Sequence, residues 1–149
     1  RWERVATLID REISDATILE QDGKLWLFAT DRDGAGSTSD TLVVYSADTL
    51  LGPWMPHPLN PIVIDRRRAR PGGQFIRSGG RVLLPIQDGT LGYGGGLGLA
   101  ELRRLDSTGI DLAEPRPVAS SGDFPHRQIH TLNRAGRLEV IDGIVAVRR

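Results

Sequence analysis

Apolar and polar residues alternate along this chain in short runs, and most runs end at glycine or proline. Residues 15–20 and 24–30 are two such runs, joined by Asp22-Gly23. Asp-Gly between β-forming residues predicts a tight hairpin, because glycine accepts the positive φ angle that the turn needs. Residues 42–46 form the next run, and an irregular edge follows that ends near residues 62–64. No run keeps a helical spacing of apolar residues for three turns, so the pattern predicts a nearly all-β protein.

The same order of runs recurs further along the chain. The later runs cover residues 74–78, 81–86, 97–102 and 110–118 in a second copy, and residues 129–133 and 137–141 in a third. The hairpin glycines Gly23, Gly80 and Gly136 lie 57 and 56 residues apart. Gly52 and Gly109, which close the third run of successive copies, are also 57 residues apart. Two landmarks with one period indicate an internal repeat.

A repeat of about four short antiparallel strands is typical of a propeller blade, although common blades are shorter, at ~40–50 residues. We therefore predict one all-β domain over residues 1–149, a partial β-propeller with blades near residues 10–64, 65–118 and 119–149. A β-sandwich or barrel also has short strands with regular turns, but neither predicts the repeated landmarks.

The number of blades suggests that the ring is incomplete. Two and a half to three blades fall short of the roughly 4–8 blades of closed propellers. Upstream blades or a second copy are therefore expected to complete it. The chain also starts at Arg1 and has its only methionine at Met55, which predicts a piece of a longer protein, a trimmed chain or a processed product.

Composition narrows the classes of partner. The formal net charge is zero and the pI is about 7.0. The chain therefore lacks the overall positive electrostatic field that draws proteins to nucleic acid or anionic membranes. No apolar run approaches the ~20 residues of a spanning helix, and no basic-then-apolar leader opens the chain. The absence of cysteine excludes disulfides and thiolate metal sites and leaves the compartment open. All basic residues except Lys24 are arginines, whose planar fork suits carboxylates, phosphates and aromatic rings.

Candidate site residues follow from the propeller. The first strand of a blade lies innermost, so Asp15, residues 70–73 and residues 128–130 should line the central channel. An acid, a guanidinium and an imidazole at one channel mouth would suit a polyhydroxylated or anionic ligand. Asp15 is the candidate general acid or base, although an isolated aspartate is more often a turn cap or a salt-bridge partner.

Residues 65–73, Asp-Arg-Arg-Arg-Ala-Arg-Pro-Gly-Gly, are the most distinctive stretch. Pro71 disfavours helix for the residue before it, and the two glycines permit close backbone approach, so the arginines lie on a shaped loop. Arg70, beside the glycines, is the candidate ligand-binding residue. Solvation and ion pairing are expected to account for Arg66, Arg67 and Arg68.

A second glycine-rich loop, residues 87–96, adds Gln87, Asp88 and Tyr93 to the candidates. The loop has neither the Walker spacing with its lysine nor a strand-to-helix GxGxxG unit, so it does not predict a phosphate cradle. Tyr93 is expected to stack on a ligand as part of a sugar platform. Trp26 and Trp54 are predicted to pack in the core.

Histidine completes the candidate set. His130 would line the channel, with a purely structural histidine as the alternative. His126 and His130 have a spacing that serves a metal ion only on a helix, and a strand is predicted here. We therefore predict no metal site from His57, His126 and His130, and no cofactor.

Several of these stretches resemble known propellers. One set of stretches resembles a blade of the five-bladed propellers of glycoside hydrolase family 43 and its arabinanase, levansucrase and invertase relatives. The set consists of Ser14-Asp15-Ala16-Thr17, Asp22-Gly23, Leu25-Trp26-Leu27-Phe28, Tyr45-Ser46, Gly52-Pro53-Trp54 and Asn60-Pro61-Ile62. A second set resembles the propeller-like amino-terminal domain of plant glucosamine inositolphosphorylceramide transferases and bacterial relatives. It consists of residues 65–73, Gln87-Asp88, Gly92-Tyr93-Gly94, residues 130–133 and Ile141-Asp142-Gly143. The resemblance covers nearly the whole chain and implies the last three of five blades.

The resemblance also bears on activity. Family 43 enzymes take a base Asp, a pKa-modulating Asp and a general acid Glu from their first three blades. Asp15 stands where the third acid would be, and the first two have no counterpart, so the chain alone lacks the carboxylate pair that glycoside hydrolysis needs. In the plant transferases, sugar transfer is assigned to a separate domain.

The sequence therefore predicts a carbohydrate-active or carbohydrate-binding propeller domain that binds a glycan or sugar phosphate. The alternative is a non-catalytic scaffold or protein-interaction propeller, in which the same residues form salt bridges and turns. The predicted site residues are Asp15, Arg70, Gln87, Asp88, Tyr93 and His130.

Overall fold

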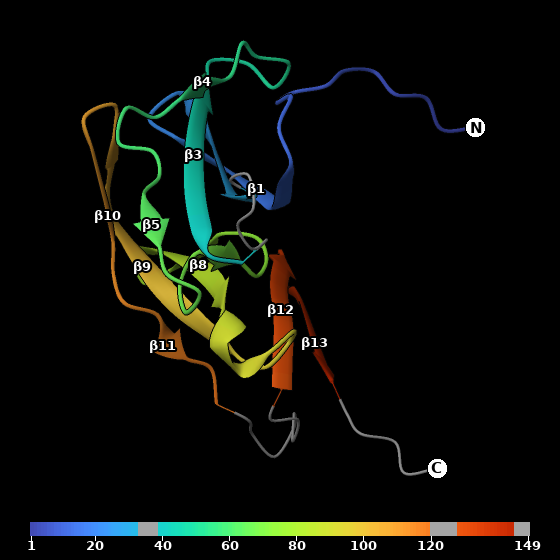
Figure 1. Ribbon diagram of the computed structural model, residues 1–149, viewed down its shortest axis with the longest axis vertical. Coiled ribbons are helices and arrows are strands. Elements are labelled where there is room, and N and C mark those ends of the chain that lie inside the picture. The colour runs from blue at the N-terminus through green and yellow to red at the C-terminus, as the bar shows by residue number, and fades with distance from the viewer. Residues whose placement is uncertain (33–38, 120–127, 145–149) are drawn as a thin grey trace.

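The computed structural model describes residues 1–32, 39–119 and 128–144. These residues form three antiparallel sheets and one short 3-10 turn, η1 (Gly89–Leu91) (Figure 1). The prediction of an all-β protein is confirmed, whereas the predicted blade boundaries stay a prediction. No helix in the described ranges is long and apolar enough to cross a membrane.

The first sheet contains the predicted Asp22-Gly23 hairpin. Its order is β1-β2-β3-β4, and β5 also pairs with β3. The strands are β1 (Ile13–Gln21), β2 (Lys24–Asp31), β3 (Thr41–Ala47), β4 (Met55–Pro56) and β5 (Val63–Ile64). Between β4 and β5, the side chain of Asn60 replaces a strand partner for Val44. It accepts from the Val44 N–H at 2.9 Å and donates to the Val44 carbonyl at 2.7 Å, which continues the edge without a regular strand.

The second sheet repeats this plan with the order β10-β9-β8-β6, while β7 also pairs with β8 and β11 with β9. The strands are β6 (Arg70–Pro71), β7 (Ile76–Ser78), β8 (Arg81–Gln87), β9 (Leu97–Asp106), β10 (Gly109–Leu112) and β11 (Arg116–Pro117). Arg70 and Pro71 were expected in a turn but form a short edge strand opposite Gln87 and Ile86. Proline is tolerated there because an edge strand leaves one row of donors unpaired.

The main core lies between the first two sheets. Phe28, which is fully buried, contacts Phe75 edge to face, with ring centroids 5.0 Å apart. Trp26 is buried in the same core and Trp54 in a smaller core on the other face of the first sheet, so both packing predictions are confirmed. Leu8 packs against that smaller core, while the chain before it extends away from the sheets (Figure 1).

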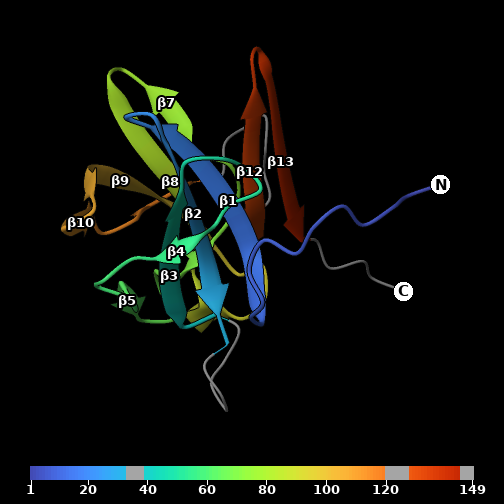
Figure 2. The same cartoon turned by 90° about the horizontal axis from the view of Figure 1, so that it is seen from above.

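The third sheet is a two-stranded ribbon of β12 (Gln128–Ala135) and β13 (Leu138–Ile144). It stands beside the second sheet and contacts β8 and β9 (Figures 1 and 2). The Leu132 N–H donates to the Gly72 carbonyl at 2.9 Å, and the Gln74 N–H donates to Asn133 Oδ1 at 3.0 Å. A Cβ atom on Gly73 would lie 1.9 Å from the Leu132 carbonyl oxygen. The Pro-Gly-Gly segment, residues 71–73, therefore anchors the ribbon to the second sheet.

Candidate functional site

The first strand of each sheet is interrupted at an equivalent point. Pairing shifts between Ser14 and Thr17 in β1 and between Ile129 and Thr131 in β12, and the second sheet has a gap between β6 and β7. Bulges of this kind redirect a side chain from the regular alternation of a strand. The interruptions fall at Asp15, at the Pro-Gly-Gly segment and at His130, so three sheets contribute to one place.

Asp15 joins the first sheet to the second. Its Oδ2 atom accepts a hydrogen bond from Arg70 Nε and another from Gln87 Nε2, the latter at 3.2 Å. Arg70 Nη1 also donates to Ser39 Oγ at 3.1 Å, and Gln87 donates to the Pro71 carbonyl at 2.8 Å. Asp15 has a φ angle of +51°, which is uncommon outside glycine and is part of the irregular turn that aims its carboxylate.

Tyr93 joins the second sheet to the ribbon. The Arg70 guanidinium carbon lies 5.7 Å from the centroid of the Tyr93 ring, within the range of a cation–π contact. The ring also packs on His130, with centroids 4.6 Å apart and planes tilted by 44°. Tyr93 nevertheless remains 69 % exposed, so much of its surface is open to a ligand.

Asp142, on β13, holds His130 from the opposite strand. Its Oδ2 lies 3.0 Å from His130 Nδ1, while its Oδ1 accepts from the backbone N–H and the hydroxyl of Thr131 at 2.6 and 2.7 Å. Partial burial alone would raise the pKa of Asp142, but the hydrogen bonds from Thr131 and His130 outweigh burial and lower the pKa below its ordinary value. Asp15, Gln87, Arg70, Tyr93, His130 and Asp142 thus form one connected group, the Arg70 cluster.

The lowered pKa of Asp142 predicts an acid-sensitive ribbon. A group whose pKa is depressed by folding stabilises the fold above its unfolded pKa, about 3.9 for aspartate, and this contribution is lost as the pH falls through the folded value. Denaturant unfolding of the wild type and Asp142→Asn, measured from about pH 6 down to about pH 2.5, should show the stability difference shrinking below about pH 4. Parallel pH profiles would contradict the role of the carboxylate.

A hollow beside the Arg70 cluster could hold a ligand. It has a volume of 510 Å³, and its walls come from all three sheets. The first sheet contributes Asp15, the second sheet Gln87 and the ribbon Thr131. Gly72 and Gly73 of the Pro-Gly-Gly segment also line the hollow. Polar groups converging on a concave surface of this kind are typical of small-molecule sites.

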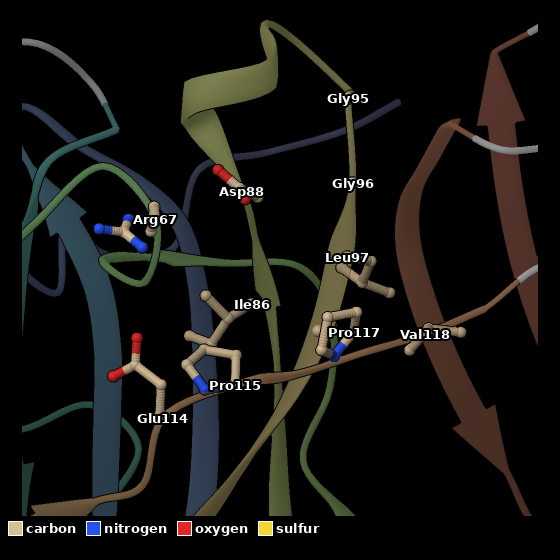
Figure 3. Close-up of a pocket in the computed structure, with 11 residues that line it drawn as sticks. Arg67, Ile86, Asp88, Gly95, Gly96, Leu97, Glu114, Pro115, Pro117 and Val118 are labelled. Atoms are coloured by element: carbon tan, nitrogen blue, oxygen red, sulfur yellow. The ribbon is translucent and has the colours of Figure 1, made fainter.

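Asp88 does not join the cluster. Its Oδ1 accepts from the N–H and the hydroxyl of Thr90 at 2.9 and 2.5 Å and so caps η1. Successive residues of an extended chain point to opposite sides, so Asp88 diverges from Gln87. It lines a separate cleft of 360 Å³ with Arg67 and Glu114 (Figure 3). This geometry favours a structural role for Asp88, although the roles of all the predicted site residues in binding stay predictions.

The remaining arginines and histidines have other surroundings. Arg68 pairs with Glu114 at 3.0 Å, whereas Arg66 and Arg67 are exposed and have no ion pair within the described part of the chain. His57 is buried, with Nε2 2.9 Å from the Asp106 carbonyl. His126 lies outside the described residues. Across those that are described, no three His, Asp or Glu side chains gather as a metal site would require.

Sequence reasoning missed Asp142 as a site residue. Its signal is the hairpin register: counting outward from the turn at Gly136 places Thr131 opposite Asp142, as observed. An acid paired next to His130 could therefore have been found. Ser39 had no comparable signal, because it lies in a glycine- and serine-rich loop without periodicity.

Known proteins resemble this chain along most of its length. A family model described as "Glucosamine inositolphosphorylceramide transferase 1, N-terminal" matches residues 1–114. Two curated proteins named glucosamine inositolphosphorylceramide transferase 1, from Oryza sativa subsp. indica and subsp. japonica, are each 30% identical over an alignment of 156 residues that covers 95% of this chain and 21% of theirs. The Arabidopsis thaliana protein of the same name is 30% identical over an alignment of 96 residues that covers 62% of this chain and 12% of its own. The chain thus spans about a fifth of the length of the rice relatives.

A solved structure supports the fold. The crystal structure of a thermostable family-43 glycoside hydrolase aligns with a TM-score of 0.51 at 18% identity, over 74% of this chain and 38% of that chain. At this identity the likeness shows the fold alone. The prediction of a partial β-propeller is confirmed.

Proposed function

This chain belongs to the family of glucosamine inositolphosphorylceramide transferase 1 N-terminal domains, as its motifs predicted, and we propose that it binds a glycan or sugar phosphate at the mouth of its propeller channel. The observation that carries the proposal is the Arg70 cluster, which connects side chains from three sheets and in which Arg70 and His130 contact a largely exposed tyrosine ring. An aromatic face with hydrogen-bonding groups around it matches a sugar, which has apolar C–H faces and a rim of hydroxyls.

The similar proteins are consistent with a sugar ligand. The relatives are named glucosamine inositolphosphorylceramide transferase 1, and the structural neighbour is a family-43 glycoside hydrolase. Fold and family suggest only the class of ligand, since one fold can host unrelated functions. The proposal therefore rests mainly on the chemistry of the cluster.

Binding suits the cluster better than hydrolysis. Asp15 Oδ2 already accepts from both Arg70 and Gln87, so this oxygen is engaged in holding other side chains. Glycoside hydrolysis needs one carboxyl group to protonate the leaving oxygen and a second to act on the other face of the sugar. In the proposed function, Asp15 is a positioning residue that fixes the orientation of Arg70.

Arg70→Lys tests the proposal. Lysine keeps the positive charge but loses the planar fork that bonds Asp15 and Ser39 and lies over Tyr93. We expect roughly tenfold weaker glycan binding, which corresponds to about 1.4 kcal/mol, while the melting temperature changes little. A glycan array of neutral and phosphorylated oligosaccharides would identify ligands, and calorimetry would give the affinities.

Arg67→Lys is the matched control, because Arg67 lies in the separate cleft and makes no ion pair with the described residues. It should leave the affinity unchanged. If the wild-type domain bound no glycan on the array, the proposed function would be wrong and the scaffold alternative would be favoured. Equal effects of the two substitutions would place the site elsewhere.

A further inference from the structure

Two basic side chains of the Arg70 cluster, Arg70 and His130, each face a carboxylate. Arg70 is bonded to Asp15, and His130 is bonded to Asp142. Both basic side chains are largely buried, with 15 % and 18 % of their side-chain surfaces exposed. An anionic ligand at this place would meet the carboxylates of Asp15 and Asp142 beside the guanidinium of Arg70, so the cluster offers it no net attraction.

The Asp142 contact also fixes what His130 can offer. An ionised carboxylate only accepts hydrogen bonds, so His130 Nδ1 must carry the proton and donate it to Asp142. In the neutral ring, this leaves a lone pair on Nε2, the nitrogen that Asp142 does not contact. Nε2 can therefore accept a hydrogen bond from a hydroxyl. A phosphate dianion has no proton to donate to it.

Arg70 supplies the complementary donors. A guanidinium has five N–H groups. One bonds Asp15 and one bonds Ser39, which leaves three for a ligand among the contacts of the described residues. A hydroxyl group both donates and accepts, so it can satisfy the acceptor on His130 and the donors on Arg70. Tyr93 lies in contact with both side chains and presents the ring on which a sugar can stack.

We propose that the Arg70 cluster selects uncharged sugars over phosphorylated ones, with the sugar ring stacked on Tyr93 and its hydroxyls bonded to Arg70 and to Nε2 of His130. This inference rests on the proposed function and narrows it from two classes of ligand to one. Asp142 is a positioning residue for this selectivity, because it sets which nitrogen of His130 is the acceptor.

The test compares matched sugars that differ only in a phosphate. The probes are glucose, galactose and mannose with their 6-phosphates, and arabinose with its 5-phosphate, each measured by saturation-transfer NMR and titration. We expect at least one free sugar to bind, with saturation transferred to its ring C–H protons. The corresponding sugar phosphate should bind roughly tenfold more weakly, because the acceptor on His130 is left unpaired. Inorganic phosphate should not displace the sugar.

Asp142→Asn tests whether Asp142 sets the selectivity, through an affinity ratio that would not change if Asp142 had a purely structural role. The asparagine oxygen can still accept from Thr131, but its NH₂ group would face His130 Nδ1 as a donor. The proton then belongs on Nε2, which changes that atom from acceptor to donor. We expect the ratio of free-sugar to sugar-phosphate affinity to fall roughly tenfold, with a nitrogen-15 spectrum that shows the tautomer change.

The outcomes separate the two proposals. A wild-type preference for the phosphorylated sugars would overturn the inference and leave the proposed function intact. An unchanged affinity ratio in Asp142→Asn, with the tautomer switched, would also overturn it. Absence of binding by every free and phosphorylated sugar, together with a blank glycan array, would overturn the proposed function and this inference with it.

Discussion

Gly73→Ala is expected to release the ribbon from the second sheet. The added Cβ would lie 1.9 Å from the Leu132 carbonyl oxygen and 2.8 Å from its carbon. Both are backbone atoms of β12, so the strand itself must move. Gly73 also has a φ angle of +141°, which disfavours any residue with a side chain. We expect about 1–3 kcal/mol for the clash and a similar cost for the strained backbone.

Release of the ribbon should be visible locally. A two-stranded hairpin is at best marginally stable alone, so β12 and β13 should lose hydrogen-exchange protection while β2, β3, β8 and β9 keep theirs. Glycan binding should fall with it, because His130 and Asp142 leave the Arg70 cluster.

Gly80→Ala is the matched control for Gly73→Ala. Gly80 also has a positive φ, of +74°, but a methyl group added there would have no described neighbour within 4 Å. The substitution should cost about 1–2 kcal/mol and leave ribbon protection unchanged. Equal loss of hydrogen-exchange protection in both variants would contradict the role of the Pro-Gly-Gly segment in anchoring the ribbon.

The strands and the repeat were predictable from local sequence. Asp-Gly and Gly-Gly turns between alternating runs specify hairpins through φ alone, and the observed turns at Gly23, Gly80 and Gly136 all have positive φ. Burial of Trp26 and Trp54 likewise follows from hydrophobicity and alternation. These features depend on neighbours in sequence, which a single chain reveals.

The site was less predictable because it depends on contacts between sheets. The sequence predicts that Gly73 permits close backbone approach, but it does not predict that the approaching backbone belongs to β12. It also groups Asp88 with Gln87, yet strand alternation sends the two side chains apart. Arg70 was found because it precedes a distinctive motif, whereas its bonds to Asp15 and Ser39 join residues 55 and 31 positions away. No local pattern encodes such pairings.

Phe28→Ala should give the largest loss of stability. Phe28 is fully buried between the first two sheets, and its ring meets Phe75 edge to face. Truncation removes the transfer free energy of a benzyl group and leaves a cavity that close-packed sheets cannot fill, at a cost of about 3–5 kcal/mol. Domains are stable by only about 5–15 kcal/mol, so a large share of the total is at risk. Urea unfolding at neutral pH measures the change.

The same substitution tests how the Arg70 cluster depends on the core. Asp15 belongs to the first sheet and Arg70 to the second, so their contact requires the two sheets to stay packed. Phe28→Leu, which fills most of the space, should lose less stability and keep glycan affinity. Leu138→Ala, at a position that is 64 % exposed, should change stability by no more than about 0.5 kcal/mol. If Phe28→Ala were as mild as Leu138→Ala, the sheets would not be held together by this core, and the geometry of the cluster would need another support.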